Sequence, residues 1–181
     1  MKKNLYPLLF VFFICSFTKV STQANIYVKI VNPNLLIEGE SIQKGYERQI
    51  DANSFAQEES NCADCYLGGP NKAKSSNFVF TTNLNKAVLG LRKAMYKGDA
   101  LDKVIISFVK TNAGGQFLYY EITLENVHVV NITDAAPGNP HVNEVQLAPA
   151  KCRWKYWVQN SNGSVDPTIQ FFWNFLTDTG G

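Results

Sequence analysis

The chain has 181 residues, of which 45% are hydrophobic and 18% charged, and its formal net charge is +2. These values are typical of one globular domain and exclude a disordered chain, and the near-neutral charge removes the electrostatic support that nucleic-acid binding usually needs. Four cysteines are too few for a disulfide-dense scaffold, and two histidines leave little room for a histidine-based metal or acid–base site.

Residues 1–24 have the three-part layout of a secretory signal peptide. Lys2 and Lys3 give a positive start, residues 5–17 are largely apolar, and a short polar segment ends at Ala24. The apolar run is shorter than the roughly 20 residues that span a bilayer, so we expect cleavage after Ala24 rather than an uncleaved anchor. The mature chain, residues 25–181, is then expected in a secreted or periplasmic, oxidising compartment.

The first half of the mature chain alternates between strand signals and polar stretches. Residues 25–31 are rich in β-branched and aromatic side chains and are stopped by Pro33, which predicts a strand. We also predict a strand over residues 46–50. Residues 52–76 hold small and polar side chains with few large apolar ones, so we predict a long loop, which in a compact domain is usually functional or mobile.

The period of the sequence then changes from that of a strand to that of a helix. Residues 77–82 alternate in the manner of a strand. The apolar residues that follow recur on one face of a helix: Leu84, Val88, Leu91 and Met95. Asn83 or Asn85 can cap the start of this helix, and Gly98 can end it.

The rest of the chain is predicted to be β structure, with turns rich in glycine, asparagine and proline between the strands. The expected strands cover residues 103–110, 116–124, 127–132, 143–147, 152–159 and 169–176. Many short strands with one helix predict a single, mainly β domain, a mostly antiparallel sandwich or barrel. The edges of strands so rich in aromatic residues need to be covered. A barrel covers them within the chain, and oligomerisation covers them between subunits.

No catalytic or nucleotide-binding signature is present, and no pair of carboxylates is placed in a recognisable cleft. We therefore predict no enzymatic activity and no cofactor. The one motif with chemical character is Cys62-Ala63-Asp64-Cys65. We favour a structural disulfide, either within this pair or from one member to Cys152, while free thiols, a metal site, a redox pair and a link between subunits stay open.

Several stretches of the mature chain together resemble one known family. Residues 26–30 with Gly39-Glu40-Ser41 look like its first strand and turn, and residues 77–98 are similar to its strand-to-helix passage. Residues 119–127, and Glu144-Val145 with Trp154-Lys155-Tyr156, are similar to its later strands. The family is Hcp, the haemolysin-coregulated proteins that build the inner tube of bacterial type VI secretion systems, and the resemblance covers roughly residues 26–176. Asn85 and Asn126 stand where the family usually has Asp, and Thr82 replaces its usual Lys.

The resemblance implies a small two-sheet antiparallel β-barrel with one flanking helix, assembled with copies of itself into a hexameric ring around a central channel. Rings of the family stack through loops, which makes residues 52–76 the candidate stacking loop, with the polar residues Asn53, Glu58, Asp64 and Lys72. We therefore expect a secreted, non-enzymatic structural protein that stacks into a tube or carries small protein cargo. Secretion-system components or effector proteins are its expected partners; nucleic acid is not, nor is a membrane after the leader is cleaved.

An alternative is an extracellular binding module that reuses the same barrel to bind a protein or a glycan. In that case the tryptophans of the last strands, Trp154, Trp157 and Trp173, would face outwards together in a groove. The interpretation that we favour is that these side chains pack in the core and in interfaces. A leader also departs from the family, whose tube proteins are exported from the cytoplasm by their own machine.

Overall fold

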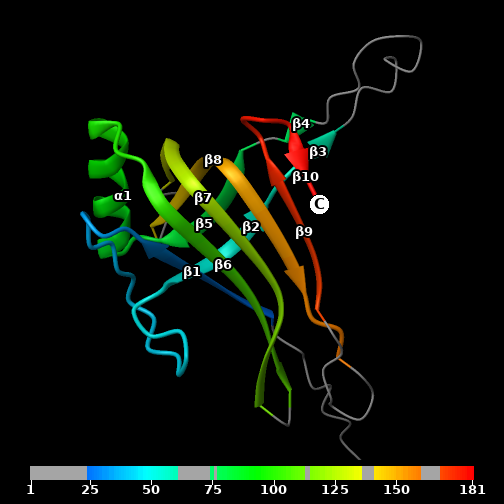
Figure 1. The fold of residues 1–181 in the computed structure, drawn as a ribbon. Coiled ribbons are helices and arrows are strands. Elements are labelled where there is room, and N and C mark those ends of the chain that lie inside the picture. The colour runs from blue at the N-terminus through cyan, green and yellow to red at the C-terminus, as the bar shows by residue number, and fades with distance from the viewer. Residues whose placement is uncertain (1–23, 61–73, 76, 113–114, 136–140, 160–167) are drawn as a thin grey trace, which may run out of the picture.

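The computed structural model describes residues 24–60, 74–75, 77–112, 115–135, 141–159 and 168–181. In this part of the chain one helix flanks a curved antiparallel sheet (Figure 1). The elements in chain order are β1 (Ala24–Val31), β2 (Ile50–Ala56), β3 (Glu59–Ser60), β4 (Lys74–Ser75), β5 (Phe78–Asn83), α1 (Lys86–Lys97), β6 (Leu101–Asn112), β7 (Gly115–Ala135), β8 (Val142–Tyr156), β9 (Ile169–Asn174) and β10 (Thr179–Gly180).

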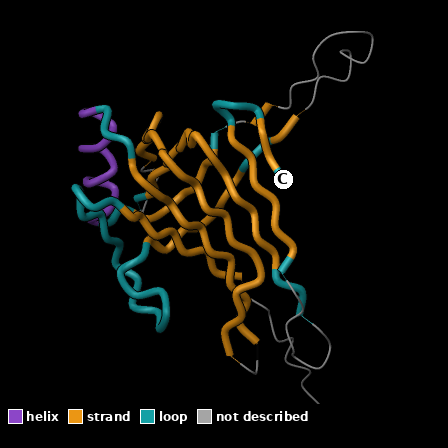
Figure 2. Tube along the Cα trace, viewed as in Figure 1, coloured by secondary structure: helices purple, strands orange, loops and turns teal. Residues whose placement is uncertain are grey.

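The main sheet closes on itself to form a barrel. Its strand order is β10-β9-β8-β5-β2-β1-β6-β7, and β7 pairs back with β8, so that β8, β5, β2, β1, β6 and β7 form a closed ring of strands. Strands β9 and β10 extend the sheet beyond the barrel (Figure 2). The predicted mainly β, antiparallel barrel with one flanking helix is therefore confirmed.

The interior of the barrel is filled by the apolar side chains that alternate along its strands. Most of them are inaccessible to solvent, namely Val28, Ile50, Phe78, Phe80, Val104, Ile106, Ile122, Leu124, Val145 and Leu147. They form one cluster with the buried face of α1. This shared core holds the helix against the barrel.

The helix begins and ends where the sequence predicts. The Asn85 Oδ1 accepts a hydrogen bond from the backbone N–H of Ala87 at 3.0 Å, and Gly98 ends the helix with a left-handed φ of 72°. Leu84 lies before the cap and is 51% exposed, so the prediction that it belongs to the buried stripe is wrong. The residues of α1 that are buried are Ala87, Val88, Leu91 and Ala94.

The prediction of one long loop over residues 52–76 is wrong at its start, because residues 52–56 belong to β2. Apart from Phe55, their small and polar side chains have low intrinsic strand propensity, but β5 pairs with residues 52–56 and β1 with residues 50–52. The strand predicted over residues 46–50 is likewise displaced, since residues 46–49 form a turn and β2 starts at Ile50.

Strand β8 changes partners along one of its edges. Residues 142–147 pair with β5, residues 151–156 pair with β9, and the other edge pairs with β7 along most of its length. Pro149, which has no N–H to donate, lies in the gap between the two pairings. The two strands predicted at 143–147 and 152–159 are therefore one. We call residues 151–156 of β8, together with β9 and β10, the wing.

Candidate assembly surface

Gly39, Glu40 and Ser41 do not form the predicted turn, which lies at residues 43–49 instead. Their segment links the chain before β2 to the helix. The backbone N–H of Gly39 donates to the carbonyl of Arg48 at 2.8 Å, and a Cβ on Gly39 would lie 2.1 Å from the Gln49 carbonyl oxygen. The Glu40 carboxylate accepts a hydrogen bond from the backbone N–H of Lys86 at 3.0 Å, at the positive end of α1. This motif is therefore architectural, since it allows a close backbone crossing and caps the helix.

The wing carries a ladder of aromatic side chains on one face. Trp154 of β8 is in register with Phe171 of β9, and their rings stack with centroids 5.4 Å apart. Phe171 stacks in turn on Trp173, at 6.3 Å. Phe171 is 48% exposed and Ile169, on the same side of β9, is 65% exposed. The wing thus presents apolar surface that this chain leaves partly uncovered.

A groove of about 340 Å³ lies between the wing and the segment around β3. Its lining residues are Gln57, Glu59, Tyr120, Trp154 and Phe171. The indole N–H of Trp154 donates to Gln57 Oε1 at 3.4 Å, which ties the wing to the start of the β3 segment. The groove therefore has aromatic walls and a polar rim.

Tyr120 and Cys152, beside this groove, have raised pKa values, so the fold favours their neutral forms. Burial raises the pKa of Tyr120 to about 12, with smaller contributions from Cys152 and Glu59. Burial likewise raises the pKa of the free Cys152 thiol, again with Glu59 nearby. A thiol that stays protonated is a poor nucleophile. Among the described residues, no group of three or more His, Cys, Asp or Glu side chains is placed to hold a metal ion.

The outer edge of the wing is an open sheet edge. Strand β10 pairs with β9 only at Trp173 and Asn174, and the backbones of Phe172 and Gly181 exchange hydrogen bonds beside them. Within the described ranges no strand pairs with residues 169–171 on this side. Their N–H and C=O groups can therefore receive a strand from another chain.

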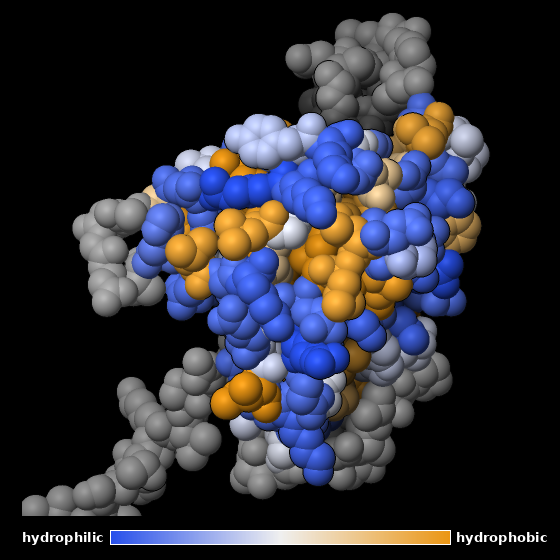
Figure 3. Space-filling view, turned by 90° about the vertical axis from the view of Figure 1, so that its left-hand side faces the viewer, coloured by the Kyte–Doolittle hydropathy of each residue, from blue (hydrophilic) through white to orange (hydrophobic). Residues whose placement is uncertain are grey.

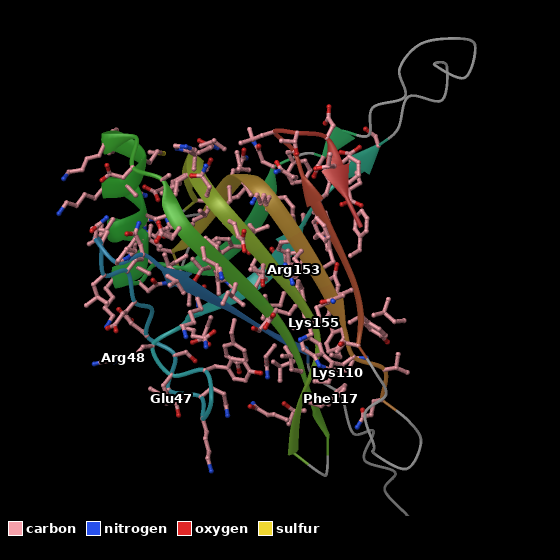
Figure 4. All side chains as sticks on the ribbon, viewed as in Figure 1. Glu47, Arg48, Lys110, Phe117, Arg153 and Lys155 are labelled. Carbon is pink, nitrogen blue, oxygen red and sulfur yellow. The ribbon has the colours of Figure 1, made fainter. Side chains whose placement is uncertain are left out.

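The opposite face of the wing is basic. Arg153 and Lys155 of β8 project from it, with Lys110 and Phe117 of the β6–β7 hairpin below them in Figure 4. Lys155 lies in register with Glu121 of β7, and its Nζ lies 4.6 Å from the ring centroid of Trp157. Arg153 lies in register with Thr123 and Phe172, neither of which carries a charge.

The residues proposed for ring stacking do not lie in one loop. Asn53 lies within β2, where its Nδ2 donates to Asn83 Oδ1 at 2.9 Å, so its assignment to a loop is wrong. Glu58 lies between β2 and β3. Asp64, Lys72 and the Cys62–Cys65 pair lie outside the described residues. Strands β3 and β4, which bracket residues 61–73, form a separate two-stranded ribbon.

The three tryptophans are all partly buried. Trp154 packs against the core and lines the groove, whereas Trp157 and Trp173 are not among the groove's lining residues. This agrees with packing rather than with a row of exposed indoles. The sequence analysis missed Tyr120, Phe171 and the polar rim of the groove, although the aromatic density of residues 169–176 was a signal for the wing. No helix among the described residues is long and apolar enough to span a membrane.

Comparison with known proteins agrees with this architecture. Residues 27–156 match the family model described as "Type VI secretion system effector, Hcp". The Major exported protein of Pseudomonas aeruginosa is 31% identical over 138 residues, which cover 71% of this chain and 80% of that protein. A solved structure of a type six secretion system protein has a TM-score of 0.76 at 20% identity and covers 88% of this chain and all of its own.

Hcp1 from Salmonella typhimurium has a TM-score of 0.70 at 19% identity, over 87% of this chain and 99% of its own. These two structural matches show the shared fold. The family model covers well over half of the chain, and the Pseudomonas relative is more than 30% identical. The chain belongs to the Hcp family of type VI secretion system proteins.

Proposed function

We propose that this Hcp protein is exported, cleaved after Ala24, and assembled into a hexameric ring around a central channel. As a member of the Hcp family it is a structural protein and not an enzyme. The name of the Pseudomonas relative, Major exported protein, supports export, and the leader-like residues 1–24 supply a route. The channel would hold small protein cargo, and the chain's other partners would be secretion-system components or effectors.

The observation that carries the ring is the open, aromatic edge of the wing. Half-exposed Phe171 and exposed Ile169 lie beside the unpaired edge of β9. A sheet edge of this kind tends to pair with a strand of another chain unless it is covered. In the proposed ring a neighbour covers the wing with a different surface, because pairing of the same edge in two copies would close a two-fold dimer. Contacts between two different surfaces generate rings when the rotation closes.

The stacking of rings into a tube would use the ribbon of β3 and β4. This ribbon leads into residues 61–73, which include Asp64 and Lys72, and Glu58 lies at its base. The ribbon pairs only with itself in the described part of the chain, so it is not held within the barrel sheet. A structural disulfide between Cys62 and Cys65 would stiffen this segment.

The ring is tested by the mass of purified residues 25–181, measured by native mass spectrometry and light scattering. We expect six copies. Ile169→Glu should reduce the mass to that of a monomer, because a carboxylate would be desolvated at the covered edge. The matched control is Leu89→Glu on α1, where the leucine has the same 65% exposure but lies on the opposite side of the barrel. A strict monomer at high concentration, or equal loss in both variants, would overturn the ring.

The leader and the disulfide are tested on the protein exported from a bacterial host. Intact mass should place the new N-terminus at Asn25, and alkylation before and after reduction should add two labels on Cys62 and Cys65 only after reduction. An uncleaved chain would contradict the leader. A monomer whose groove binds a glycan or a peptide through Trp154 would instead favour the binding module.

A further inference from the structure

Helix α1 presents a second exposed surface, on the side of the barrel opposite to the wing (Figure 1). Four exposed residues lie three or four positions apart along one side of α1: Leu89, Lys93, Tyr96 and Lys97. We call these four residues the helix surface. Tyr96 is 84% exposed and Leu89 is 65% exposed. Leu89 and Tyr96 lie two helical turns apart on the same stripe, with Lys93 between them, so exposed apolar and basic side chains alternate along this surface.

A neighbouring segment of the chain packs against the helix. A Cβ on Gly90 would lie 3.0 Å from Ile37 Cγ1, so the chain around Ile37 runs along the helix. Leu36, the residue before Ile37, is 82% exposed. Figure 3 shows this face of the molecule, on which apolar patches lie between hydrophilic residues.

The helix surface carries a positive charge, and α1 has no acidic residue to neutralise it. Two of its four basic residues are paired, Arg92 with Asp134 and Lys86 with Glu38. The other two, Lys93 and Lys97, have no ion-pair partner among the described residues. The helix surface therefore combines apolar side chains with two free ammonium groups.

The wing of a second copy does not match this surface. The wing is also apolar, but residues 151–156, 169–174 and 179–180 contain no Asp or Glu that could pair with the lysines of the helix surface, and their charged side chains are all basic. Like charges brought together at an interface oppose association. An anionic membrane is also a poor match, because basic clusters that bind anionic lipids hold roughly four to eight Lys or Arg residues, whereas Lys93 and Lys97 are the two unpaired basic residues of the helix among the described residues.

We propose that the helix surface binds an acidic surface of a different protein, one in which carboxylates flank an apolar side chain. The carboxylates would pair with Lys93 and Lys97, and the apolar side chain would pack against Leu89 and Tyr96. Since the helix lies opposite to the wing, such a partner could be bound while the wing is covered by a neighbouring copy. This inference does not depend on the ring.

The test uses residues 25–181 and three probes. The first is a labelled 16-residue amphipathic helical peptide with leucines on one face and glutamates on the other, and the second is the same peptide with glutamine in place of glutamate. The third is vesicles of phosphatidylcholine and phosphatidylglycerol. Fluorescence anisotropy should detect binding of the glutamate peptide that weakens with salt. The double variant Lys93→Gln/Lys97→Gln should weaken it about fivefold, as expected for two exposed ion pairs. Tyr96→Ala should weaken binding of the glutamate peptide as well.

The matched control is Lys29→Gln/Lys44→Gln, which removes the same charge from exposed positions elsewhere. It should change the affinity less than about twofold. Equal loss in both double variants, equal binding of the glutamine peptide, or binding of the vesicles alone would overturn the proposal. The mass of each variant is measured in parallel, so that failure of the ring can be told apart from failure of the peptide site. A monomer that still binds the peptide through α1 contradicts only the ring.

Discussion

The barrel and the wing share strand β8 but differ in what they need from other chains. Within the barrel each strand has neighbours on both sides, and inward side chains such as Phe80 and Ile106 are at most 1% exposed. In the wing, no described strand pairs with residues 169–171 on the outer side of β9, and Phe171 remains 48% exposed. The barrel can therefore be stable by itself, whereas the wing has surface that is best stabilised by a partner.

The change between the two regions occurs within a few residues of β8. Before Pro149 the strand is held by β5 inside the closed sheet, and after it by β9 outside. The same alternating pattern of side chains thus leads first to a core and then to a surface. What distinguishes the core from the surface is the number of neighbouring strands and side chains that cover it. Four sets of substitutions can test that distinction.

The largest difference should be between Phe80→Ala and Phe171→Ala. Removing the buried Phe80 ring leaves a cavity and should lower the free energy of unfolding by about 3–5 kcal/mol. Phe171 is half exposed, so its loss should cost the monomer about 1 kcal/mol or less, while weakening assembly. Urea denaturation of dilute residues 25–181 measures both. Equal losses would mean that the wing is part of the folding core.

Gly39→Ala should be the next most disruptive change, on the barrel side. Its Cβ would meet the Gln49 carbonyl oxygen at 2.1 Å, and backbone cannot move aside cheaply, so we expect a loss of at least about 2 kcal/mol. Gly45→Ala is the control, because Gly45 has a φ of +86° but open space around it. Gly45→Ala should therefore lower the free energy of unfolding by about 1 kcal/mol, from the strain of a left-handed backbone alone. Thermal unfolding gives both values.

Tyr120, at the junction of barrel and wing, should make the fold sensitive to alkaline pH. Its pKa rises from 10.0 to about 12 on folding, so the fold favours the neutral phenol. The stability from this group is complete below pH 10 and is lost as the pH rises from about 10 to about 12. In Tyr120→Phe the free energy of unfolding should therefore fall less steeply between about pH 10 and about pH 12, by about 1 kcal/mol per pH unit.

Unfolding in urea at several pH values measures that slope. Some alkaline loss should remain in the variant, because burial also raises the pKa of Cys152. An identical slope in the variant and the parent would show that the phenol is not desolvated by the fold.

The smallest contrast is between two asparagine caps. Asn85 caps α1, and Asn85→Ala should cost about 1 kcal/mol. Asn174 Oδ1 accepts from the backbone N–H groups of Leu176 and Thr177 in the exposed turn of the wing. Asn174→Ala should cost about 0.5 kcal/mol, since water can replace the lost acceptor there. A larger loss at Asn174 would show that the wing turn contributes to the stability of the whole domain.

Local signals in the sequence were sufficient for the helix and for several strands. Asn85 and Gly98 bound α1 because a capping amide and a left-handed glycine act within a few residues. The alternating residues 77–82 and the branched residues 25–31 form β5 and β1 with small shifts at their ends. The resemblance to the Hcp family on these same stretches also indicated the barrel correctly.

The tertiary structure decided the elements whose stability comes from distant neighbours. Residues 52–56 form the end of β2 because β5 pairs with them along one edge and the Phe55 ring packs against Phe78 and Phe108, although their other side chains are small or polar. The groove joins Gln57 to Trp154, which are 97 residues apart, so no local pattern could indicate it. Composition and periodicity determined that this chain is a mainly β domain with one helix. Which strand edge closes and which stays open for a partner depended on the pairing of β8, because backbone hydrogen bonds between strands carry no local sequence code.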